Sequence, residues 1–219
     1  MKDQGRTSFA TVDWRHLLLL LGATLALWAP RLQGPIDLRW DGAVYYVTGT
    51  SLAEGHGYRL LNEPGSPRAV QYPPALPILV AAVQTAVGTT DPAKAGHALR
   101  LVYLLISLAW VAATYLLARR FLRPGLSLLV GGLVALHHDT LFHSDLLFTE
   151  VPFGLVTVLF AMAALSGRTA LAGGLGALGF LLRTSGLALL AAGVAEAVLR
   201  RDLRQALLRL ALSVVPVLA

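Results

Sequence analysis

The chain has 219 residues, and its composition excludes an ordinary soluble domain, because 56% of the residues are hydrophobic and only 14% are charged, against roughly 45–50% and about 25% in soluble proteins. The formal charge of +6 does not indicate a nucleic-acid partner, since the Lys and Arg residues stand mostly at the ends of apolar runs, where they set membrane topology. The absence of cysteine excludes disulfides, thiolate metal sites and thiol nucleophiles.

Apolar stretches of about 18 residues or more recur along the chain, and a helix needs roughly that length to cross a bilayer. They predict an all-α fold, a polytopic transmembrane helical bundle with a large extracytoplasmic first loop that contains short interfacial helices. We expect residues 1–219 to form a single membrane domain. The last apolar segment, 206–219, stops before it can span, which predicts truncation at the C-terminus.

The first predicted span covers residues 14–33 and follows a short tail, residues 1–13. Basic residues in and just after this tail predict that the N-terminus faces the cytoplasm of a plasma membrane. The span ends in Trp28-Ala-Pro-Arg31 and not in a small-residue cleavage site, so we expect a retained anchor and not a cleaved signal peptide. Residues 34–96 would then form an extracytoplasmic loop.

This external loop is mixed in polarity and contains most of the Pro-Gly turn signals. Residues 43–54 and 74–87 within it have the pattern of short helices. The second is entered through Tyr72-Pro-Pro-Ala-Leu-Pro77, where proline suits the first helical turn. Both helices are too short to span, so we expect them along the membrane interface, with four tyrosines at headgroup depth: Tyr45, Tyr46, Tyr58 and Tyr72.

Three further spans are predicted at residues 97–118, about 126–136 and 151–165. The second either ends at residue 136 or extends through the polar stretch after it. The connection between the first two is basic and marks a cytoplasmic turn. By contrast, the connection 137–150 contains acids but no Lys or Arg, so it is expected on the extracytoplasmic side, with the large loop.

The apolar stretch 169–199 is interrupted by Arg183-Thr-Ser-Gly186 and has basic residues on both flanks. Two cytoplasmic flanks require an even number of crossings, so we expect either two half-length helices that meet at Arg183 or a re-entrant hairpin. An arginine between apolar segments needs a compensating partner. A neighbouring carboxylate and the phosphate of a lipid-linked substrate both meet that need.

Ionisable residues gather at two further places. Asp41 follows Trp40, and it either caps the helix that begins at Ala43 or serves as a general base for a hydroxyl acceptor. The segment His137–Glu150 holds three His, two Asp and one Glu, and is either a solvated loop or a functional rim. Its spacings allow a divalent cation, although no HExxH pattern occurs. The candidate ligands are either His138, Asp139 and His143, or Asp145 and Glu150.

Five short motifs follow one another in a distinctive order: Asp41 with Tyr45-Tyr46, Leu52-Ala-Glu-Gly-His-Gly-Tyr58, Tyr72-Pro-Pro74, His143-Ser-Asp-Leu-Leu-Phe-Thr-Glu150 and Leu182-Arg-Thr-Ser-Gly-Leu187. This series resembles the N-terminal half of the GT-C glycosyltransferases, near the protein O-mannosyltransferases, the lipid A aminoarabinose transferase and their bacterial relatives. The chain departs from that pattern in having Gly42 after Asp41, where a second acid is frequent, and in having His-His-Asp where a proline is common.

The resemblance implies a membrane enzyme that transfers a sugar from a polyprenyl-phosphate donor, with inversion, to an acceptor hydroxyl on a glycan, lipid or protein at the extracytoplasmic side. Asp41 would act in catalysis, Arg183 would hold the donor phosphate, and Glu150 would lie at the rim of the active site. The resemblance leaves open whether the enzyme needs a divalent cation. Three further residues are expected to help bind substrate: Tyr45, Tyr72 and His143.

Two other classes of function stay open on the sequence. A secondary transporter also uses broken helices around a charge, but it predicts a second interrupted segment, and none is visible. A loop of about 60 residues is also longer than the usual connections. A non-catalytic membrane scaffold would tolerate replacement of both Asp41 and Arg183.

Overall fold

The computed structural model describes residues 13–199 and residue 211. Within these ranges the chain is built of helices, without strands, which confirms the all-α prediction. Two isolated bridges, Asp37 with Leu146 and Arg59 with Arg68, join loop segments. Three predicted segments lie outside the described residues: the tail 1–13 apart from Asp13, the basic flank 200–209, and the apolar segment 206–219 apart from residue 211.

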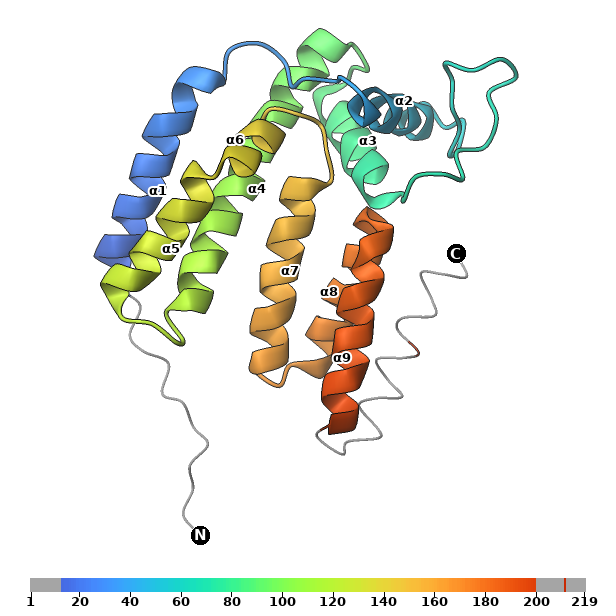
Figure 1. The fold of residues 1–219 in the computed structure, drawn as a ribbon. Coiled ribbons are helices and arrows are strands. Elements are labelled where there is room, and N and C mark those ends of the chain that lie inside the picture. Colours follow the sequence, from blue (N-terminus) through green and yellow to red (C-terminus); the bar gives the residue numbers. More distant parts are fainter. Residues whose placement is uncertain (1–12, 200–210, 212–219) are drawn as a thin grey trace.

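Successive long helices run in opposite directions (Figure 1). In chain order the elements are α1 (Trp14–Trp28), η1 (Ala29–Arg31), α2 (Asp41–Ala53), α3 (Ala75–Val87), α4 (Pro92–Ala118), α5 (Pro124–Leu136), α6 (His138–Ser144), α7 (Glu150–Leu165), α8 (Thr169–Leu182), η2 (Thr184–Gly186) and α9 (Leu187–Leu199).

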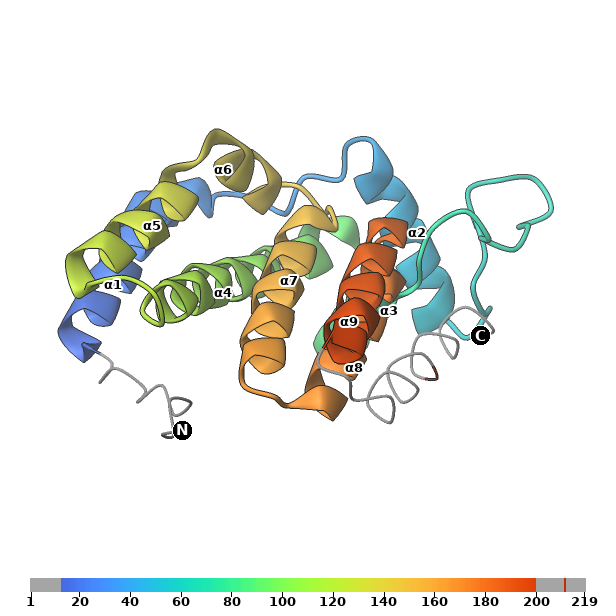
Figure 2. The same ribbon diagram turned by 60° about the horizontal axis from the view of Figure 1, so that its bottom comes forward.

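The two ends of the bundle differ in what they carry. The turns after α4 and α7 lie at the lower end in Figure 1, and they contain Arg119, Arg120, Arg123 and Arg168. The opposite end carries α2, α3 and the connection between α6 and α7 (Figures 1 and 2). The large loop and residues 137–150 were predicted to face one compartment, and they do lie at the same end.

Only some of the predicted membrane spans form helices that are long and apolar enough to cross a membrane. Among the described helices, α4 alone is long and apolar enough to cross a membrane, and α5 with α6 meets the same test only as a pair bent by 53°. The bend lies at His137, whose extended backbone (ψ 133°) interrupts the helix. The helices α3, α7, α8 and α9 are apolar but shorter than 18 residues.

The predicted break at Arg183 is present and forms a tight hairpin. The helix α8 ends because Arg183 is extended (φ −149°, ψ 141°), and η2 then turns the chain into α9. Gly186 is needed at this turn, since a Cβ atom there would lie 2.2 Å from the carbonyl carbon of Gly179. Arg183 therefore lies at the tip of a hairpin, at the end of the bundle that carries α2 and α3 (Figure 1).

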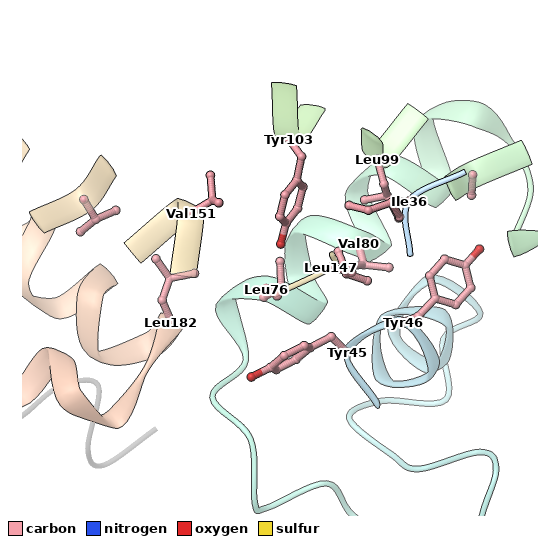
Figure 3. Close-up of a cluster of buried hydrophobic side chains, with 12 residues drawn as sticks. Ile36, Tyr45, Tyr46, Leu76, Val80, Leu99, Tyr103, Leu147, Val151 and Leu182 are labelled. Atoms are coloured by element: carbon pink, nitrogen blue, oxygen red, sulfur yellow. The ribbon is translucent and has the colours of Figure 1, made fainter. Parts of the chain in front are cut away.

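The pair α2–α3 packs on the rest of the bundle through the main buried cluster (Figure 3). Within the pair, Gly49 of α2 lies so close to α3 that a Cβ atom on it would come 2.5 Å from Cγ1 of Val80. Apolar burial of this kind is the main favourable term in folding. The cluster draws side chains from α2, α3, α4, α7 and α8, among them Tyr45, Leu76, Tyr103, Val151 and Leu182.

Candidate functional site

A pocket with about 180 Å³ of water-accessible space opens where α2, the start of α7 and the α8–α9 turn meet. Four of the residues singled out in the sequence line it: Asp41, Tyr45, Glu150 and Arg183. They come from three segments far apart in the chain. The other lining residues are Gln71, Pro73, Phe148, Thr149, Leu182 and Thr184.

Asp41 is the first residue of α2 and is exposed. The residue before the helix is Trp40, and no side chain caps the helix end, so the predicted capping role of Asp41 is wrong. A carboxylate in the first turn is still favoured by the helix dipole. Its oxygen Oδ1 accepts a hydrogen bond from the hydroxyl of Tyr72 at 3.2 Å.

Tyr72 does not line the pocket, but it touches two residues that do. Its ring packs edge-to-face on Tyr45, with 5.4 Å between centroids, and its hydroxyl donates to Asp41. Desolvation, followed by the negative charge of Asp41, raises the pKa of Tyr72, and burial raises the pKa of Tyr45. Both phenols therefore stay protonated near neutral pH. Tyr58 steadies the loop by donating to the carbonyl oxygen of Tyr72 at 2.9 Å.

Arg183 is ion-paired with Glu150, the first residue of α7. The side chains are 37% and 34% exposed, so the pair is open to the pocket and is not sealed in the core. Of the two compensating partners that the sequence suggested, the free protein uses the carboxylate. With Asp41 included, the pocket holds two carboxylates and one guanidinium, a formal charge of −1.

Asp145 does not line this pocket and instead forms ion pairs with residues of two other segments. Its carboxylate is ion-paired with Arg31 after α1 and lies 3.2 Å from Nη2 of Arg100 in α4. Within residues 13–199 and 211, no group of three or more His, Cys, Asp or Glu is placed to hold a metal ion. The predicted pairing of Asp145 with Glu150 as cation ligands is therefore not supported by this geometry.

His143 also lies outside the pocket lining. Its Nδ1 atom is 2.7 Å from the carbonyl oxygen of Asp139, one helical turn earlier. Its ring lies 5.9 Å from that of Phe148, which does line the pocket. His143 was expected to bind substrate, but it reaches the pocket only through its contact with Phe148.

The sequence reasoning missed the backbone of Trp40. This residue has φ 53° and ψ −126°, a region that favours glycine and costs a residue with a side chain about 1–3 kcal/mol. The Gly42 N–H donates to the carbonyl oxygen of Arg39 at 3.1 Å and closes the turn. Gly42 is itself packed against the chain, because a Cβ atom there would lie 3.4 Å from the carbonyl oxygens of Asp37 and Leu147. No residue pattern signals a positive φ at a tryptophan.

Comparison with protein-family models, with curated proteins and with solved structures found no match to this chain. The resemblance to the GT-C enzymes therefore rests on the order of the short motifs, and any function must be argued from the pocket.

Proposed function

We propose that the chain is a membrane glycosyltransferase, which moves a sugar from a polyprenyl-phosphate donor to an acceptor hydroxyl with inversion. The observation that carries this proposal is the convergence of Asp41, Glu150 and Arg183 on one pocket. A carboxylate able to accept a proton and a guanidinium able to bind phosphate are the two groups that this reaction needs.

The exposed faces of the helices support a bundle in lipid. Large aliphatic side chains are exposed on α4 and on several other helices, and large exposed apolar patches are rare in soluble proteins. Acyl chains would solvate these faces, and short helices are accommodated by local thinning of the bilayer. Examples that are more than half exposed are Leu18 and Leu19 on α1, Leu101 and Leu105 on α4, and Leu129 and Leu133 on α5.

The placement of positive charge supports an extracytoplasmic pocket. The turns after α4 and α7 contain Arg119, Arg120, Arg123 and Arg168. These turns lie at the opposite end of the bundle from α2 and the α8–α9 turn (Figure 1), whose residues line the pocket. Short loops rich in Lys and Arg stay in the cytoplasm. The pocket would then face the other side, where sugars carried on polyprenyl phosphate are transferred.

In the proposed reaction, Asp41 accepts the proton of the acceptor hydroxyl while the hydroxyl oxygen attacks the anomeric carbon of the donor. The bond between that carbon and the phosphate oxygen breaks, and polyprenyl phosphate leaves with the electron pair. Attack opposite the leaving group inverts the anomeric configuration. The hydrogen bond from Tyr72 keeps the Asp41 carboxylate at the pocket.

Arg183 would stabilise the negative charge that grows on the leaving phosphate. Its guanidinium has five N–H donors, so it can keep part of its contact with Glu150 while it binds a phosphate oxygen. In this scheme Glu150 orients the guanidinium and also competes with the phosphate for it.

The test is transfer from a radiolabelled polyprenyl-phosphate sugar in membranes that carry the full-length gene. Asp41→Asn and Arg183→Ala should each lower the transfer rate by about 10²-fold or more. Asp139→Asn is the matched control, because this carboxylate is 69% exposed and lies outside the pocket lining. Unchanged transfer in both site variants would refute the proposal.

One observation favours the alternative of a secondary transporter. Such proteins carry paired broken helices, and the 53° bend between α5 and α6 is a second interruption beside the one at Arg183. No residue of that bend lines the pocket, which is why we place the transporter second. Uptake of a labelled sugar phosphate into proteoliposomes, without any transfer, would reverse this order.

A further inference from the structure

Trp40 presents an exposed aromatic surface directly before Asp41. The residue is 62% exposed. Its ring centroid lies 6.1 Å from that of Phe142 and 6.2 Å from that of Phe148, both at tilted angles. Phe148 lines the pocket, so the aromatic surface continues from the pocket wall to the outside of the molecule.

Packing does not explain why a tryptophan occupies this strained position. A buried side chain could offset an unfavourable backbone through its contacts, but most of this residue is open to the surroundings. Trp40 has a positive φ, and the backbone on either side of it is closely packed, at Gly42 and at the bridge from Asp37 to Leu146. Strain that the surroundings maintain in this way is characteristic of ligand-binding positions.

Arg39 adds hydrogen-bond donors to the same surface. Its guanidinium carbon lies 5.2 Å from the centroid of the Trp40 ring, and its Nη2 atom is 2.6 Å from the carboxylate of Asp37. The Arg39 side chain is 64% exposed, so donors remain accessible. An exposed aromatic ring with N–H donors over one of its faces suits a sugar ring, which has an apolar C–H face and hydroxyl groups at its edge.

We propose that Trp40 and Arg39 form a subsite for a sugar ring of the acceptor, so that the acceptor is a glycan or glycolipid and not a bare polypeptide. This inference rests on the proposed function. The donor sugar must lie inside the pocket, between Asp41 and Arg183, whereas Trp40 is not part of the pocket lining. A ring stacked on Trp40 therefore belongs to the acceptor.

Transfer kinetics in membranes with the full-length protein test the subsite. Trp40→Ala should raise the acceptor KM by about tenfold and leave kcat and the donor KM within about twofold, while Trp40→Phe should keep most of the affinity. The matched control is Trp14→Ala, because Trp14 is 65% exposed on the far end of α1. An unchanged acceptor KM in Trp40→Ala, with transfer still abolished in Asp41→Asn, would overturn the subsite and leave the proposed function standing.

A binding experiment separates this idea from the transfer chemistry. Methyl glycopyranosides of mannose, glucose and galactose should change the tryptophan fluorescence of the purified full-length protein in a saturable way. The change should disappear in Trp40→Phe and persist in Asp41→Asn. A response that Trp40→Phe retains, or no response to any glycoside, would refute the subsite. A loss of membrane insertion in Trp40→Ala, with normal glycoside affinity of that same variant in detergent, would instead make Trp40 an interfacial anchor and refute the subsite as well.

Discussion

Arg183 and Glu150 form an ion pair that joins the tip of the α8–α9 hairpin to the first residue of α7. The two residues are 33 positions apart in the chain, and both line the pocket that also holds Asp41. The guanidinium of Arg183 therefore already has an anionic partner within the protein. In the proposed reaction, the donor phosphate and Glu150 would compete for the same guanidinium.

Replacement of Glu150 by Gln should strengthen donor binding. The pair is about one-third exposed, and pairs of that kind contribute at most about 1 kcal/mol, so we expect the donor KM to fall by up to about fivefold. The measurement is donor-dependent transfer in membranes, with Glu63→Gln on the exposed loop as the control. A higher donor KM in Glu150→Gln would mean that Glu150 orders the site more than it competes.

Replacement of Gly186 by Ala should damage both stability and transfer. The new Cβ atom would lie 2.2–2.4 Å from the backbone of Gly179 and Phe180, so the hairpin must open and Arg183 must move. Overpacking of this kind costs about 1–3 kcal/mol or more. Gly174→Ala on α8 is the matched control, because nothing lies within 4 Å of its Cβ position. Thermal unfolding in detergent would compare them, and equal melting temperatures would contradict the hairpin geometry.

Replacement of Asp145 by Asn should weaken the contacts that join the end of α6 to Arg31, after α1, and to Arg100 in α4. Arg100 has a side chain that is only 12% exposed, and it would lose an anionic partner. Hydrogen bonds to charged groups contribute about 1.5–3 kcal/mol, so the melting temperature should fall. Asp139→Asn should change it little, since that carboxylate is 69% exposed. If cation titration instead stabilised the wild type and not Asp145→Asn, Asp145 would be a metal ligand.

Stability should fall at alkaline pH, partly through Tyr58. Burial raises the pKa of Tyr58 from 10.0 to about 12, so the folded state favours the protonated phenol. That contribution is complete below about pH 10 and is lost as the pH rises toward 12. Unfolding curves between these pH values should be less pH-dependent in Tyr58→Phe. A slope equal to that of the wild type would show that Tyr58 titrates normally.

Replacement of Trp40 by Gly should stabilise the protein relative to Trp40→Ala. Glycine adopts the positive φ of this position without strain, whereas alanine keeps the strain and lacks the ring. We expect a difference of about 1 kcal/mol in favour of Trp40→Gly, measured by thermal unfolding. A more stable Trp40→Ala would mean that the turn relaxes when the ring is removed.

Local patterns predicted the helices well but not their ends. The helix expected from His97 begins at Pro92, because Asp91 caps it by accepting a hydrogen bond from the Ala93 N–H at 3.0 Å. The first span was expected to reach residue 33, but α1 ends at Trp28 and η1 continues it, since Pro30 has no N–H to donate. Capping residues and prolines fix a helix end within a few residues, whereas hydrophobic periodicity is read over a longer window and does not locate that end.

The sequence by itself determined the helical class, the short helices within residues 34–96 and the break at Arg183, because hydropathy and turn residues act locally along the chain. Only the tertiary structure decided which charges meet. Arg183 is paired with Glu150, and Asp145 is committed to Arg31 and Arg100. Such pairs depend on how closely distant helices approach, and glycine contacts and buried side chains set that approach in three dimensions.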